Sequence, residues 1–232
     1  MKIVLNFLLA VAAVVMAYLC YQSIQTPINF KNEVARRDAV VIQKLKDIRT
    51  IQEAYRDKYQ VYCPNWKQLV EFAKNDSVPI VNKIGSLTDQ QLADGLNEKD
   101  AWMYLTNPKK YAKEIDKFGL DIKDFSRDTV FVPLLEKDST FINRKDFNVD
   151  SIYFVPFAQN ADTFELTIGS VTTQSGYEMS LFQANVRYDV YLWDLNEQEL
   201  ANKIDDKVQQ EKFPGLQVGD ATEANNNAGN WE

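Results

Sequence analysis

The hydrophobic pattern is densest at the start of the chain. Residues 3–21 read IVLNFLLAVAAVVMAYLCY, where Asn6 is the single strongly polar side chain and no residue is charged. About 20 apolar residues span the hydrocarbon core of a bilayer. The pattern therefore predicts a transmembrane anchor over residues 1–22, with the lipid bilayer contacted by residues 3–21.

A cleaved signal peptide is the alternative interpretation of this segment. Such peptides end in small residues at the cleavage site. Here the segment ends Ala17-Tyr18-Leu19-Cys20-Tyr21, with bulky residues where small ones are needed. We therefore expect the anchor to stay attached to the chain.

A helical period follows the anchor. Pro27 predicts a short linker over residues 23–29, and residues 30–60 then carry apolar positions three, four or seven apart without glycine or proline. The stripe is Val34, Val41, Leu45, Ile48 and Tyr55. This predicts a long amphipathic helix whose C-terminal half packs on the core. Because the same helix is expected to contact other proteins, these residues are also candidate interaction positions.

The second half of the chain changes to a strand-like composition. Segments rich in Val, Ile, Phe, Tyr and Thr alternate with Asn, Asp, Gly and Ser turns. The predicted strands are 129–135, 151–157, 163–171, 178–184 and 188–193. Together with the helix they predict an α+β fold, with one domain over residues 30–215 and an antiparallel sheet mainly within 129–193.

The last residues are poor in apolar side chains, which predicts a flexible tail over 216–232. Trp231 is the exception. It is either a docking residue on a flexible segment or part of an untied terminus.

Composition removes several classes of function. The 232 residues carry a net charge of −7 and contain no histidine, which argues against nucleic-acid binding and excludes histidine-based triads and most zinc sites. Cys63 has no histidine to serve as its base, and we expect a buried structural thiol. Asp116, Asp121 and Asp124 have the wrong spacing for an EF-hand, and we expect solvated carboxylates. We predict no catalytic, cofactor-binding or metal-binding residues and no cofactor.

One resemblance rests on the order of these elements. An apolar anchor and a long helix lead to Tyr62, Pro64, Trp66 and Leu69, and the helix contains Arg37, Asp38, Leu45, Ile48, Arg49, Gln52, Ala54, Tyr55 and Tyr59. This arrangement resembles type IV pilins and the pseudopilins of type II secretion, over residues 1 to about 72. The resemblance implies a helical spine under a sheet and assembly with other envelope proteins. The processing motif of that family is missing, because no glycine precedes Gly85 and no glutamate precedes Glu33.

These observations predict a non-catalytic, single-pass subunit of a cell-envelope complex of the secretion, pilus-like or translocation type. Its partners are expected to be other membrane proteins, bound through the anchor and residues 30–60. Counting the basic residues that flank the anchor favours a cytoplasmic domain, whereas the short N-terminal tail favours export. We expect a periplasmic domain on the inner membrane. The alternative is a membrane-tethered binding domain for an envelope ligand, glycan or divalent cation, using Trp193, Tyr191 and the acidic residues of 116–124.

Overall fold

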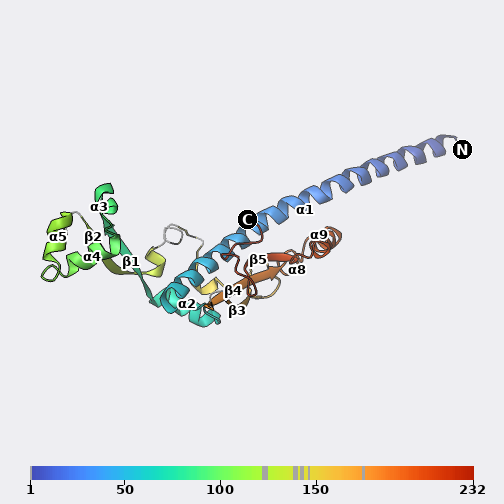
Figure 1. Ribbon diagram of the computed structural model, residues 1–232. Helices are drawn as coiled ribbons and strands as arrows, with labels where there is room; N and C mark the ends of the chain where they lie inside the picture. Colours follow the sequence, from blue (N-terminus) through green and yellow to red (C-terminus); the bar gives the residue numbers. More distant parts are fainter. Residues whose placement is uncertain (1, 122–124, 138–140, 142–143, 146, 174–175) are drawn as a thin grey trace. The chain divides into compact units, whose positions relative to one another are not determined.

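The structure is a computed structural model that describes residues 2–121, 125–137, 141, 144–145, 147–173 and 176–232. The chain forms two compact units, which are described separately. Unit 1 comprises residues 1–73 and 146–232, and unit 2 comprises residues 74–145. Figure 1 gives the order of the elements along the chain.

Unit 1 is organised around helix α1, which runs from Lys2 to Tyr59 without interruption. Pro27 lies inside the helix, so the predicted linker over 23–29 is wrong. Proline removes one backbone hydrogen bond and costs about 3 kcal/mol in a helix interior. The uncharged residues before it and the amphipathic residues after it both favour helix, so the helix continues through this position.

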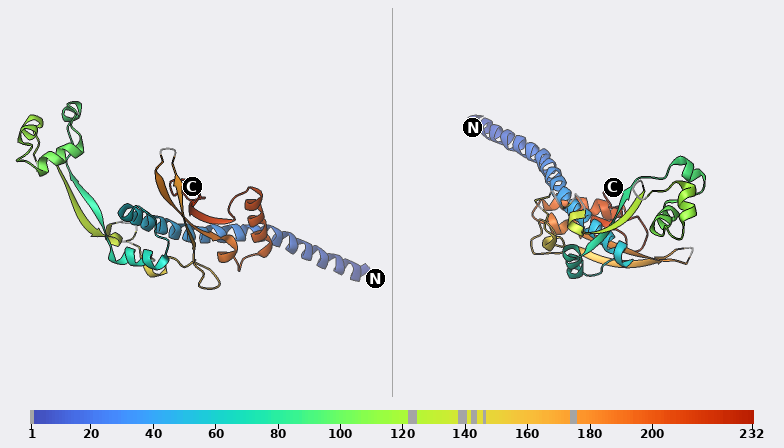
Figure 2. Two further views of the ribbon diagram at one scale, coloured as in Figure 1. Left: turned by 60° about the horizontal axis from the view of Figure 1, so that its bottom comes forward. Right: turned by 90° about the vertical axis from the view of Figure 1, so that its left-hand side faces the viewer.

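The sheet of unit 1 has three antiparallel strands in the order β3-β4-β5. Strand β3 (Glu165–Thr172) pairs with β4 (Glu178–Arg187), which pairs with β5 (Gly215–Gly219). Helix α1 contacts β4 and β5, and Phe182, Ala184 and Val186 are buried on one face of β4. The β3–β4 hairpin is visible in both views of Figure 2.

Short helices complete unit 1. Helix α2 (Trp66–Asn75) follows the end of α1, and the 3-10 turn η1 (Val149–Ser151) precedes the sheet. Helix α8 (Tyr188–Tyr191) follows β4 directly, and α9 (Glu197–Gln209) leads to β5.

Unit 2 is a two-stranded antiparallel ribbon with a small helical cap. The ribbon pairs β1 (Ser77–Ile84) with β2 (Ser126–Pro133), and α6 (Leu134–Lys137) follows it. The cap contains α3 (Asp89–Ala93), α4 (Glu98–Thr106) and α5 (Ala112–Phe118). Its core, here called the cap core, is formed by buried apolar side chains: Leu87, Leu96, Ala101, Leu105, Leu120 and Phe125.

The predicted α+β fold class is confirmed, with a long apolar N-terminal helix and antiparallel sheets. The single domain over 30–215 differs from the structure, which separates residues 74–145 as unit 2 and gives each unit its own sheet. Sequence periodicity identifies strands but does not show which strands pair, because pairing depends on contacts distant in sequence.

Two predicted strands are wrong. Residues 151–157 form the end of η1 and turns, and 188–191 form α8. The buried residues of the second segment are Tyr188, Tyr191 and Leu192, a spacing that suits a helix rather than the alternation of a strand. Their aromatic composition favours strand, and burial of one helical face outweighs that preference.

The predicted flexible tail over 216–232 is also wrong. Residues 216–219 belong to β5, and Val218 forms a bridge with Gly229 on the strand's other side. The backbone N–H of Gly219 donates to Ala228 O at 3.0 Å, and that of Asn230 donates to Gln217 O at 3.0 Å. The terminal residues therefore satisfy the polar edge of β5, which low apolar content alone does not reveal.

Candidate membrane anchor and its junction with unit 1

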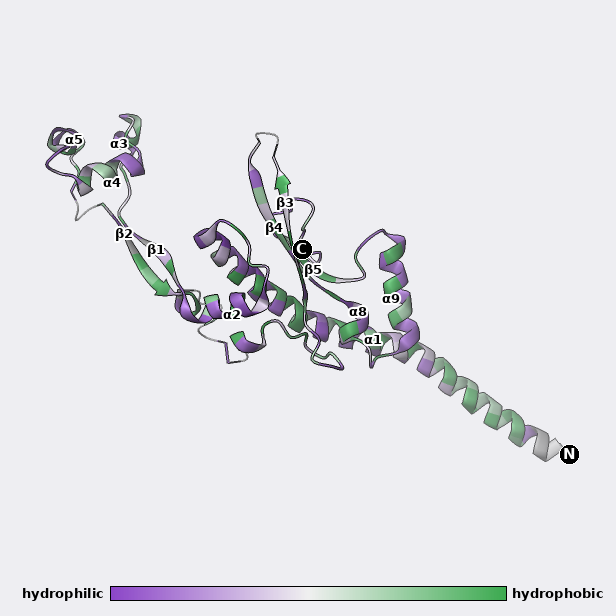
Figure 3. Ribbon diagram, turned by 90° about the horizontal axis from the view of Figure 1, so that it is seen from below, coloured by the Kyte–Doolittle hydropathy of each residue, from purple (hydrophilic) through white to green (hydrophobic). Residues whose placement is uncertain are grey.

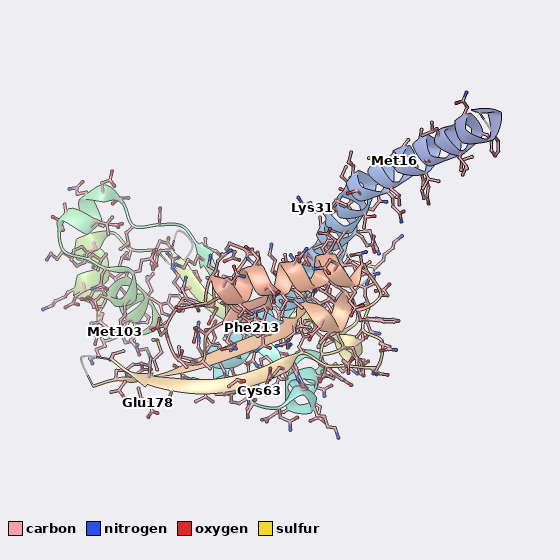
Figure 4. All side chains as sticks on the ribbon, turned by 90° about the vertical axis from the view of Figure 1, so that its right-hand side faces the viewer. Met16, Lys31, Cys63, Met103, Glu178 and Phe213 are labelled. Atoms are coloured by element: carbon pink, nitrogen blue, oxygen red, sulfur yellow. The ribbon has the colours of Figure 1, made fainter. Side chains whose placement is uncertain are left out.

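The first half of α1 is an apolar helix without a protein environment. One helix segment near the N-terminus, beginning at Asn6, is long and apolar enough to cross a membrane, and the apolar window found there has 0% of its residues buried. The large side chains from Phe7 to Tyr21 are all exposed. Figure 3 shows this run as the green part of α1 that projects from the sheet, and Figure 4 places Met16 on it. The segment is compatible with a single-pass membrane anchor.

The dimensions of the segment fit that role. Twenty residues of α-helix are about 30 Å long, which is the thickness of the hydrocarbon core. No residue between Lys2 and Lys31 is charged. Tyr18 and Tyr21 lie at the end of the predicted span, where tyrosine is favoured at membrane interfaces.

Arg37 joins α1 to the loop after α8. Its guanidinium donates to both carboxylate oxygens of Asp194, with Nη2 to Oδ2 at 2.8 Å, and to the carbonyl of Tyr191 at 2.8 Å. It also donates to Glu33 one turn earlier at 2.9 Å. Hydrogen bonds from Arg37 lower the pKa of Asp194. Hydrogen bonds from Arg36 and then Arg37 lower the pKa of Glu33 to about 2. Arg37 is buried, and each of its three guanidinium nitrogens has a partner, so its role is to hold this end of unit 1 onto α1.

A second polar contact joins the next residue of α1 to the same region. Asp38 accepts a hydrogen bond from the hydroxyl of Tyr191 at 2.6 Å, and burial raises the pKa of this carboxyl. Lys203 of α9 lies over the ring of Tyr188 at 4.2 Å, and burial lowers the pKa of that lysine. Burial also raises the pKa of Tyr188 to about 12. These groups anchor α8 and α9 to the start of the buried part of α1.

Lys44 holds the irregular segment before β3. Its ammonium donates to Ser151 O at 2.6 Å and to Phe154 O at 2.9 Å, and burial lowers its pKa. Trp66 of α2 donates from its indole N–H to Phe164 O at 3.2 Å, next to the start of β3. The irregular segment is therefore fixed by these side-chain donors together with one isolated antiparallel bridge between Phe154 and Thr163.

The predicted interaction positions on α1 are not surface residues. Val34, Val41, Leu45, Ile48 and Tyr55 are all buried within unit 1. An apolar stripe on a helix is covered by its own sheet when one is available, so the stripe indicates the core rather than a partner site. The large apolar residues that α1 exposes beyond the predicted anchor are Ile24, Ile28, Val40 and Tyr59.

The C-terminal residues form a strap across unit 1, defined here as residues 220–232. Asn227 is buried, and its amide donates to Glu53 Oε1 and to the hydroxyl of Tyr62, both at 2.9 Å. Arg49 donates to Asn227 O at 3.1 Å and to Glu232 Oε1 at 2.9 Å. The strap connects the edge of β5 to α1.

Trp231, the remaining predicted interaction residue, belongs to this strap and is partly buried. Its ring lies so close to Gly229 that a Cβ there would be 2.3 Å from ring atom Cζ2. Its indole nitrogen is buried without a hydrogen-bond partner. Trp231 is thus held by the strap rather than carried on a flexible segment.

The candidate chemistry falls in separate places. Cys63 is buried, its backbone N–H and C=O both pair with the side chain of Gln52, and burial raises the pKa of its thiol. This confirms the expected buried thiol. Tyr191 is completely buried, whereas Trp193 is exposed and donates to Phe157 O at 3.1 Å. Asp124 lies outside the described residues. Within the described ranges no group of three or more Cys, Asp or Glu side chains is placed to hold a metal ion.

Comparison with known proteins identifies no relative of this chain. No family model matches the chain, and neither the curated proteins nor the solved structures contain a significant match.

Proposed function

We propose that this protein is a non-catalytic, single-pass membrane subunit of a cell-envelope complex. The observation that carries the proposal is the fully exposed apolar half of α1, which is continuous with the helix that supports unit 1. A subunit built in this way has one helix that both anchors it and positions its folded part. We further propose that the folded part lies in the periplasm and the anchor in the inner membrane.

Helix α1 also supplies the contact surface in this proposal. Because the sheet covers its buried stripe, partners would contact the anchor and the opposite face of the helix, where Val40 is 42% exposed. The resemblance to pilins and pseudopilins supports this use of the long helix. Because the processing motif is missing, we propose a permanently anchored subunit rather than a processed filament subunit.

Site-specific photocrosslinking in native membranes tests the proposal. A photoreactive residue at Val40 or Ile24 should give adducts with another envelope protein or with a second copy. The same residue at Val208, which is 57% exposed on α9, is the matched control and should give few adducts. Adducts from α1 would support the subunit role. Their absence from both α1 positions, together with a monomeric protein after gentle extraction, would reject it.

A thiol-labelling experiment tests the side of the membrane. Cys20 is replaced by serine, Cys63 is buried, and Ala201→Cys adds one exposed thiol on α9. A membrane-impermeant maleimide should label this thiol from the periplasmic side of intact cells. Labelling only after lysis would place the domain in the cytoplasm. Release of the protein from membranes by alkaline carbonate would reject the membrane anchor.

A further inference from the structure

The charges of the two units differ. Unit 1 has 14 basic and 21 acidic residues and so accounts for the net charge of −7, whereas unit 2 has 12 of each. Within unit 2 the signs are segregated along the chain. Residues 89–100 contain four acidic residues and one lysine, and residues 109–117 contain four lysines and two acidic residues. Residues 109–117 of the cap thus have a local excess of positive charge in an acidic protein.

The cap holds these lysines outward. A turn at 107–111 leads into α5, where Ile115 and Phe118 pack against the cap core. Gly119 ends the helix in the left-handed conformation at φ 59°. All four lysines of the turn and helix are exposed, and we call them the lysine face: Lys109, Lys110, Lys113 and Lys117.

The lysine face has no ion pair that would explain it as a structural feature. Among the described residues no carboxylate lies within salt-bridge distance of these four ammonium groups, and Glu114 and Asp116 flank them without pairing. Arg127 and Lys83 of the ribbon, by contrast, both pair with Glu98. Unpaired like charges repel one another, so the face is electrostatically suited to an anionic partner.

Aromatic rings accompany two of the lysines. Lys110 Nζ lies 4.9 Å from the centre of the Tyr111 ring, and Lys117 Nζ lies 4.7 Å from that of Phe118. Tyr111 also packs against Tyr104, with ring centres 5.0 Å apart. Contact with a ring face restrains an ammonium group without neutralising it. Lys110 and Lys117 are therefore partly ordered and still available for a ligand.

The spacing favours an extended partner with repeated charges. Lys113 and Lys117 lie one helical turn apart, about 6 Å between their Cβ atoms, and Lys109 and Lys110 lie in the turn that leads into the same helix. Lysine binds phosphate oxygens as a point charge, without the fixed geometry of arginine. A phosphate polymer carries negative charge on every repeat, and its oxygens offer a high density of acceptors for ammonium groups.

We propose that the lysine face of unit 2 binds a linear phosphate-bearing polymer of the cell envelope. Four neutralised phosphates give an expected slope of about −3 for the logarithm of affinity against the logarithm of salt concentration, by counterion release. The envelope origin of the polymer rests on the proposed function, whereas phosphate binding by the lysine face does not depend on what α1 contacts.

Fluorescence anisotropy with labelled inorganic polyphosphate tests this, using the full chain in neutral detergent micelles. Wild type should bind with the slope above. Lys113→Gln/Lys117→Gln should bind at least tenfold more weakly at low salt, with about half the slope. Lys67→Gln/Lys99→Gln removes two exposed lysines elsewhere and should match wild type. Circular dichroism should show the same helix content in all three proteins.

Several results would overturn the proposal. Absence of polyphosphate binding, or equal effects of the two double variants, would reject the lysine face as the site. Equal or tighter binding of poly-L-glutamate would replace the phosphate polymer by an acidic protein segment. Binding to phosphatidylglycerol vesicles without binding to polyphosphate would assign the face to a membrane surface instead.

Discussion

Replacing Asn227 by alanine tests the role of the C-terminal strap. Asn227 is 8% exposed, and its side chain is the point where the strap meets α1 through Glu53 and the loop after α1 through Tyr62. Its backbone has φ 56°, in the left-handed region. Asparagine tolerates this region better than most residues, whereas alanine does not.

The cost can be worked from these contacts. The side-chain amide makes two donor hydrogen bonds, each worth about 1 kcal/mol net. Placing alanine in the left-handed region adds about 1 kcal/mol. The hydroxyl of Tyr62 still accepts from Arg56 at 2.7 Å, but it loses Asn227 Oδ1, the acceptor to which it donates at 3.2 Å. We expect Asn227→Ala to lower the free energy of unfolding of unit 1 by about 2–4 kcal/mol.

Urea unfolding of the full chain in micelles measures this change. Trp102 belongs to unit 2, whereas Trp66, Trp193 and Trp231 belong to unit 1. A Trp102→Phe background therefore makes indole fluorescence report unit 1 alone, which avoids treating two units as one transition.

Two glycine variants separate the backbone contribution to this cost from the side-chain contribution. Asn227→Gly keeps the left-handed backbone without strain and loses the side-chain hydrogen bonds, so it should cost about 1 kcal/mol less than alanine does. Asn226 has the same φ of 56° and is exposed, so Asn226→Gly is the control and should cost little. If Asn227→Ala changes the midpoint no more than this control, the strap does not stabilise unit 1 and the reasoning is wrong.

Three further changes test other parts of unit 1. Asp194 has a pKa lowered by Arg37, so its contribution to stability is present above its unfolded pKa and is lost as the pH falls through the folded value. Asp194→Asn should therefore flatten the acid limb of a pH–stability curve. Because the ion pair is partly exposed, the loss at pH 7 should be only about 1 kcal/mol. Gly169→Ala would place a Cβ 1.8 Å from the carbonyl oxygen of Ala221, and we expect a loss of about 1–3 kcal/mol in thermal unfolding, against no loss for Ser170→Ala. Leu45→Ala should cost about 2–5 kcal/mol because the side chain is completely buried, whereas Val40→Ala should cost under about 0.5 kcal/mol.

The elements that the sequence predicted well are those governed by local periodicity. The stripe from Val34 to Tyr55 repeats at helical spacing without glycine or proline, and the structure buries each of its members. The exposed apolar segment is equally local, because its length and lack of charge are properties of consecutive residues. Such signals need no knowledge of distant contacts.

The errors arise where a distant contact decides the conformation. The terminal residues EANNNAGNWE have the composition of a disordered tail, yet Asn226 and Asn227 adopt left-handed backbone angles and the segment covers the edge of β5. The run of asparagines is the signal that was available, since asparagine is enriched at such angles. Apart from Glu33, the partners given above for Arg37 and Lys44 lie more than a hundred residues away, so no local pattern identifies them.

The continuity of α1 through Pro27 has a mechanical consequence for the proposed function. A flexible linker would let unit 1 rotate freely about the end of an anchor. A single helix, with Arg37 and Asp38 fixing α8 and the loop after it, instead links the rotation of the anchor to that of the sheet. Contacts made by the anchor would then determine which face of unit 1 meets a neighbour. The buried stripe of α1 stabilises the fold itself, whereas specificity for partners would depend on the residues that α1 leaves exposed.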